Sequence, residues 1–84
     1  MDGSPIVFAQ LDSFEYHNGW ILSCSPVGMC FESRIHLSAG DRIVIKMVSY
    51  CMIMDAQVEW CREMKKKDHT CYITCVRYDD SVLL

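Results

Sequence analysis

The chain contains 84 residues, of which 51% are hydrophobic, and its formal net charge at pH 7 is −3. This length fits a single domain, 1–84, and the hydrophobic fraction is too high for an intrinsically disordered chain. The mild acidity disfavours unspecific binding to nucleic acids or to anionic membranes, because both require a basic surface.

The amino-terminal residues 1–13 contain no Lys or Arg and no long apolar run, so they do not resemble a signal peptide. The most apolar region, 43–54, is interrupted by Lys46 and is too short to span a bilayer. We therefore expect a cytoplasmic protein without a membrane partner.

Short β segments separated by turn signals follow one another along the chain. The turn signals lie at 17–19, 25–28, 37–41 and 65–68. The predicted strands are, in chain order, 14–16, 20–24, 29–33, 42–49, one within 52–64, and 70–78.

Two of these strands show the period-two alternation of a half-buried sheet. The side chains expected to share one face of their strand are Ile43, Ile45 and Met47, and then Ala56, Val58 and Trp60. Helical periodicity is poor throughout, and 55–67, which could be forced onto a helix, also alternates like a strand. The sequence therefore predicts an all-β fold, either a barrel or a sandwich. We favour a small antiparallel β-barrel, because closure would leave no exposed edge.

Six cysteines stand at positions 24, 30, 51, 61, 71 and 75. Their irregular spacing and the lack of an export signal favour reduced thiols, because cytosolic proteins rarely hold structural disulfides. Disulfides and a zinc site are the alternatives. The residues considered as zinc ligands are Cys61, His69, Cys71 and Cys75, but no C-x-x-C pair of the kind that structural zinc sites use is present. We expect no metal site.

Catalysis and nucleic-acid binding find little support in the sequence. No nucleophile signature surrounds any cysteine or histidine, and a domain of this size offers little room for a substrate cleft. A nucleic-acid-binding barrel would need a basic face with exposed aromatic residues. Here the basic run 65–67 falls in a turn, whereas the aromatic residues that fall in predicted strands are Trp20, Phe31, Trp60, Tyr72 and Tyr78. We therefore expect neither an enzyme nor a nucleic-acid partner.

The segment 19–33, with the sequence GWILSCSPVGMCFES, resembles the signature of the PilZ family. Ser23, Ser25 and Gly28 stand at the three fixed positions of that family's D/N-x-S-x-x-G motif. Further segments that resemble the family are 40–45, 56–60 and 72–78. The resemblance covers 19–79 and implies a six-stranded antiparallel barrel. It also implies a bacterial receptor for the second messenger cyclic di-GMP, with the three motif residues contacting the ligand and no other cofactor.

The chain departs from the family pattern in two ways. Residues 1–33 contain no Arg or Lys, so the R-x-x-x-R pair that grips phosphate and guanine cannot be placed. Ser23 replaces the Asp or Asn that opens the second motif. Each charge-assisted hydrogen bond contributes roughly 1.5–3 kcal/mol, so losing several would weaken binding about a thousandfold.

We therefore expect a PilZ-like signalling domain with weak or lost binding of cyclic di-GMP, which acts through contacts with a protein partner. In this interpretation Ser25 and Gly28 serve the turn. The alternatives are a functional cyclic di-GMP receptor and a small β-barrel whose cysteines have a metal or redox role.

Overall fold

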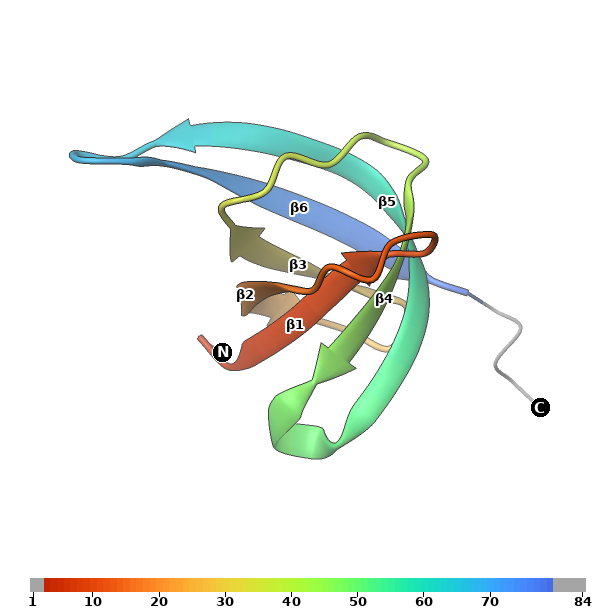
Figure 1. Ribbon diagram of the computed structural model, residues 1–84. Helices are drawn as coiled ribbons and strands as arrows, with labels where there is room; N and C mark the ends of the chain where they lie inside the picture. Colours follow the sequence, from red (N-terminus) through yellow and green to blue (C-terminus); the bar gives the residue numbers. More distant parts are fainter. Residues whose placement is uncertain (1–2, 80–84) are drawn as a thin grey trace.

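The computed structural model describes residues 3–79, which form six antiparallel strands closed into a barrel (Figure 1). The predicted all-β barrel is confirmed. The strands are β1 (Pro5–Gln10), β2 (His17–Cys24), β3 (Gly28–Ser33), β4 (Arg42–Met47), β5 (Met52–Lys65) and β6 (Thr70–Tyr78), and η1 (Val48–Tyr50) is a single 3-10 turn. Within the described residues no helix has the length and apolar character needed to cross a membrane.

The strands follow the order β1-β2-β3-β6-β5-β4, and β4 pairs with β1 to close the sheet. Consecutive strands therefore pair as hairpins at β1–β2, β2–β3, β4–β5 and β5–β6, whereas β3–β6 and β1–β4 join segments that are far apart in sequence. These two long-range pairings join the three-stranded unit β1–β2–β3 to the three-stranded unit β4–β5–β6.

The first strand is not where the sequence placed it. The predicted strand 14–16 lies in a loop, and Phe14 is 99% exposed. β1 lies upstream instead, because Ile6 and Phe8 alternate into the core and pair with both β2 and β4. The turn predicted at 17–19 is also wrong: these residues begin β2, since pairing with β1 overrides the local Asn-Gly signal.

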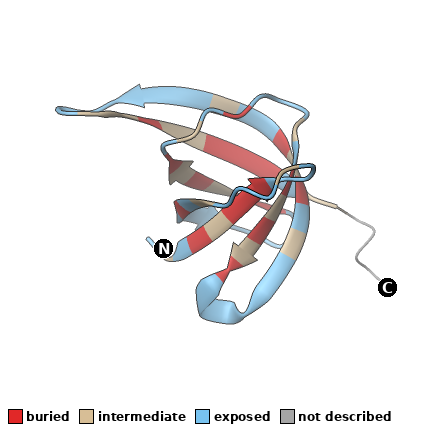
Figure 2. Ribbon diagram, viewed as in Figure 1, coloured by how far each residue is buried: buried red, intermediate tan, exposed pale blue. Residues whose placement is uncertain are grey.

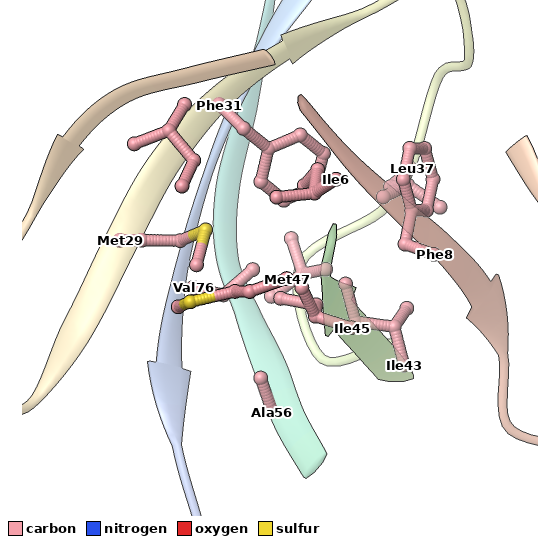
Figure 3. Close-up of a cluster of buried hydrophobic side chains, with 12 residues drawn as sticks. Ile6, Phe8, Met29, Phe31, Leu37, Ile43, Ile45, Met47, Ala56 and Val76 are labelled. Atoms are coloured by element: carbon pink, nitrogen blue, oxygen red, sulfur yellow. The ribbon is translucent and has the colours of Figure 1, made fainter. Parts of the chain in front are cut away.

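Buried residues occur along all six strands (Figure 2). Their apolar side chains fill the barrel interior (Figure 3). Phe8 and Phe31 meet at its centre with their ring centroids 4.9 Å apart. The cluster of buried apolar residues consists of Ile6, Phe8, Ile21, Met29, Phe31, Leu37, Ile43, Ile45, Met47, Ala56, Val58 and Val76. Leu37 comes from the β3–β4 loop, so this loop covers part of the core that the strands leave open.

The alternation predicted for β4 is confirmed, because Ile43, Ile45 and Met47 are all buried. The strand ends at Met47, two residues before the predicted boundary, because the chain turns through η1 there.

The face predicted for β5 holds only for its first half. Ala56 and Val58 are buried, but Trp60 is 41% exposed. The register shifts between Val58 and Trp60, a bulge that leaves Glu59 without an opposite residue on β6. One extra residue reverses the alternation, so Cys61 packs against the core instead of Trp60.

The cysteines only partly follow the sequence-based expectation. Cys24, Cys51, Cys61 and Cys71 are free thiols, but Cys30 and Cys75 form a disulfide between β3 and β6. The expectation of reduced thiols is therefore wrong for this pair. The two residues lie 45 positions apart in sequence and directly opposite each other in the sheet, so only the register reveals their proximity.

Thiol counting tests this pairing. Protein purified without reductant and then denatured is expected to show four reactive thiols out of six. The Cys30→Ala/Cys75→Ala variant should lose about 2–4 kcal/mol of unfolding free energy in urea titrations, because a cross-link restricts the unfolded chain. Cys51→Ala, at an exposed free thiol, is the control and should change stability by less than about 0.5 kcal/mol. Six reactive thiols would contradict the disulfide.

Candidate functional site

The three residues that resemble the PilZ motif lie together at one end of the β2–β3 hairpin. Ser23 is near the end of β2, Ser25 is in the turn, and Gly28 is the first residue of β3. The three residues are therefore close together in the structure. Their hydrogen bonds and packing show which of them stabilise the fold.

Ser25 shapes the turn through backbone and side chain. Its amide donates to the Gly28 carbonyl over 2.9 Å. Its Oγ accepts from the Val27 amide over 3.3 Å and donates to the same Gly28 carbonyl over 3.4 Å. This is the local hydroxyl-to-backbone pattern that stabilises turns.

Gly28 is required by packing. It is buried opposite Arg77 of β6, and a Cβ atom built on it would lie 2.2 Å from the Val76 carbonyl oxygen. A paired backbone cannot move that far without losing hydrogen bonds. A residue with a side chain at position 28 would therefore push β3 away from β6. The glycine therefore permits the close approach of these two strands.

Ser23 is less constrained. It follows a bulge between Ile21 and Ser23 in which Leu22 has no opposite residue, and it pairs with Cys30. It is exposed, and its hydroxyl makes no hydrogen bond within 3–79. Of the three motif residues, Ser23 alone is free for a ligand.

The fold brings two arginines to this end of the barrel that were not predicted from the sequence as site residues. Arg77 lies opposite Gly28, and one row of paired residues continues through Gln57 of β5 to Arg42 of β4. Neighbouring strands are about 4.8 Å apart, so Arg77 is one strand spacing from the motif glycine and Arg42 about three. No local sequence pattern predicts that these two arginines lie near the motif, because the row forms only when the strands pair.

Both arginines face carboxylates. The Arg42 guanidinium lies 2.6 Å from an Asp79 oxygen, and Arg77 Nε lies 3.7 Å from Glu59. The Asp79 amide also donates to the carbonyl of Asp55, which adds a third acidic residue to this end. The row therefore presents little net positive charge to an anion.

Tyr78, the last residue of β6, packs against the core beside the turn. The Tyr78 amide donates to the Val27 carbonyl over 2.9 Å, and its hydroxyl lies 3.4 Å from Cys24 Sγ. Burial raises the pKa of the Tyr78 phenol, and the hydrogen bond with Cys24 raises this pKa further. The phenol is therefore neutral at physiological pH and adds no charge to the site.

The residues considered for zinc are not brought together. Cys75 is in the disulfide, Cys61 accepts a hydrogen bond from Thr74 over 3.3 Å, and His69 contacts Asp68 over 3.1 Å. Within 3–79 no group of three or more His, Cys, Asp or Glu side chains has the arrangement of a metal site.

An open hollow of about 430 Å³ lies where the β1–β2 loop meets the start of β4. Its lining residues are Gln10, Leu11, Asp12, Gly40, Asp41 and Arg42. The Asp41 carboxylate accepts hydrogen bonds from the Ser38 amide and the Gln10 side chain, so it stabilises the β3–β4 loop.

Comparisons of the chain with protein-family models, with curated proteins and with solved structures found no match.

Substitutions in the turn test the roles of its residues. Gly28→Ala is expected to lower the unfolding free energy by about 1–3 kcal/mol, because the added methyl group overpacks against the β6 backbone. Ser25→Ala should cost about 1 kcal/mol, the usual worth of a hydrogen bond. Ser23→Ala is the control and should stay within about 0.5 kcal/mol in the same urea titration. A Gly28→Ala variant as stable as the wild type would contradict the packing role.

Proposed function

We propose that the chain is a non-catalytic, PilZ-like signalling module of the bacterial cytoplasm. It binds cyclic di-GMP weakly or not at all and acts through contacts with a protein partner. The observation that carries the proposal is the charge around the motif: Arg77, opposite Gly28, and Arg42, farther along the same row of paired residues, both face carboxylates.

The ligand side of the proposal follows from what cyclic di-GMP demands. The ligand carries two phosphates, and its capture requires fixed positive charge with free donors. Arg77 and Arg42 are balanced by Glu59 and Asp79. Although an exposed ion pair is weak in itself, a carboxylate beside each arginine also repels an incoming phosphate.

The motif residues add little to a nucleotide site. Ser25 is bonded within the turn and Gly28 is packed against β6, so both have a sufficient structural reason to be present. Ser23 is exposed but lacks the carboxylate that would pair with a guanine edge.

The protein-contact side of the proposal rests on the outer surface of the barrel. Trp20 and Leu22 of β2 are 46% and 43% exposed, and Trp60 and Met64 of β5 are 41% and 42% exposed. Aromatic residues and Met are enriched at protein interfaces, and several such side chains on so small a domain favour binding of another macromolecule.

Two alternatives each have one observation in their favour. Arg77 lies opposite Gly28 and is itself exposed, which favours a retained cyclic di-GMP receptor. The Cys30–Cys75 disulfide favours a redox role.

Calorimetric titration with cyclic di-GMP at moderate salt tests the proposal. The wild type is expected to show no saturable binding at micromolar ligand. A variant that combines Ser23→Asp, Glu59→Gln and Asp79→Asn should gain measurable affinity, because it frees both arginines and restores the acid of the motif.

The matched control is the triple variant Ser23→Asp, Glu63→Gln and Asp79→Asn, in which Glu59 is unchanged. Glu63 lies farther along β5, opposite Tyr72, and its neutralisation leaves Arg77 paired. Saturable micromolar binding by the wild type would overturn the proposed loss of the ligand.

A further inference from the structure

One edge of β5 is left without a partner strand. β4 pairs with β5 only from Met52 to Gln57, and the last backbone bonds on that side join Val58 to Gly40 and Asp41. From 59 to 65 the backbone of β5 bonds to β6 and to no other segment within 3–79. We call 59–65 the free edge.

The free edge arises because the β5–β6 hairpin is longer than the rest of the barrel. In Figure 1 this hairpin extends beyond the other strands, and the β3–β4 loop runs back to the start of β4, where Gly40 and Asp41 bond to Val58. β3 pairs with β6 only as far as Tyr72, so the end of the hairpin is a two-stranded ribbon. Such ribbons are marginally stable alone, and a third strand would stabilise this one.

The side chains of the free edge offer apolar contact on one face. Trp60, Arg62 and Met64 alternate with Cys61, Glu63 and Lys65, so the first three share the outer face. Trp60 and Met64 are both exposed, and the Arg62 guanidinium lies 4.9 Å from the centre of the Trp60 ring. An added strand would thus meet apolar, cationic and apolar side chains in order.

The charge of this region selects the kind of partner. Residues 59–67 carry four basic and two acidic side chains, a net charge of +2 in a chain whose total is −3. Of the basic residues, Lys66 contacts Glu32 over 3.2 Å, while Lys65 and Lys67 make no ion pair within the described chain. Charge complementarity therefore favours an acidic segment.

A second copy of the chain fits the free edge poorly. Pairing two copies by a two-fold axis through its centre would place the two Arg62 side chains opposite each other, and like charges directly across a sheet repel. Two regions of net positive charge would also approach each other.

We propose that the free edge of β5 accepts an extended acidic segment of a partner protein as an added antiparallel strand. This inference rests on the proposed function and names the partner class. The segment carries apolar residues opposite Trp60 and Met64 and acidic residues opposite Arg62 and Lys65. Main-chain hydrogen bonds supply the affinity, and these side chains select the sequence.

The probe for this proposal is a synthetic peptide built to that register, acetyl-Glu-Val-Thr-Glu-Thr-Val-Thr-amide with a fluorescein label. Fluorescence anisotropy with the full chain should show saturable binding. The same peptide with N-methyl groups on alternate backbone nitrogens keeps its charge and apolar content but loses donors, and it should bind at least tenfold more weakly. A peptide with Gln in place of both Glu residues should also bind more weakly and with less dependence on salt.

Variants of the chain locate the site. Met64→Glu and Lys65→Glu should each weaken binding at least tenfold, because they place negative charge beside the acidic probe. Met52→Glu is the matched control: it is an exposed Met at the other end of β5 and should leave binding unchanged. Hydrogen exchange should show new protection over 59–65 when the probe is bound.

Several results would overturn the proposal. They are equal binding of the N-methylated peptide, no saturable binding at millimolar probe, and a dimer in sedimentation that Met64→Glu dissociates, which would assign the edge to a second copy. None of these changes the cyclic di-GMP titration, which reports on the turn at Ser25 and Gly28. Nucleotide binding there would overturn the proposed function while leaving the free edge to be judged by the peptide.

Discussion

Closure of the sheet between β1 and β4 is the constraint on which the rest of the structure depends. Phe8 lies opposite Ile45 on β4 and opposite His17 on β2, so β1 joins the two ends of the sheet. Its inward residues, Ile6 and Phe8, then complete a core that the other strands alone would leave open to water. Closure gives β1 and β4 a partner strand on both sides, and within the described residues a long unpaired edge is left at 59–65, where β5 runs beyond the barrel.

Two bulges decide which side chains of β2 and β5 face the core and which face outward. The bulge in β2 leaves Leu22 outside the register, and the bulge in β5 does the same for Glu59. Each adds one residue to its strand and thereby reverses which side chains face inward. In β5 the consequence is that Trp60 turns outward and Cys61 turns toward the core.

The two regions with functional proposals differ in electrostatics. At the β2–β3 turn, Arg77 and Arg42 are matched by nearby carboxylates, which leaves little attraction for a phosphate. Along 59–67 the basic residues outnumber the acidic ones. The region 59–67 therefore attracts acidic groups more strongly than the β2–β3 turn attracts a phosphate.

The local pattern of the sequence determined the strand class, the positions of β3 and β6, and the inward face of β4, because the alternation of side chains depends only on neighbouring residues. The serine and glycine of the β2–β3 turn were recognisable for the same reason. β1 was missed because its alternation is short and depends on two partner strands. The outward turn of Trp60, the Cys30–Cys75 disulfide and the row from Gly28 to Arg42 were decided by the tertiary structure alone. Each depends on the register between strands, and register is fixed by the packing of residues that lie far apart along the chain.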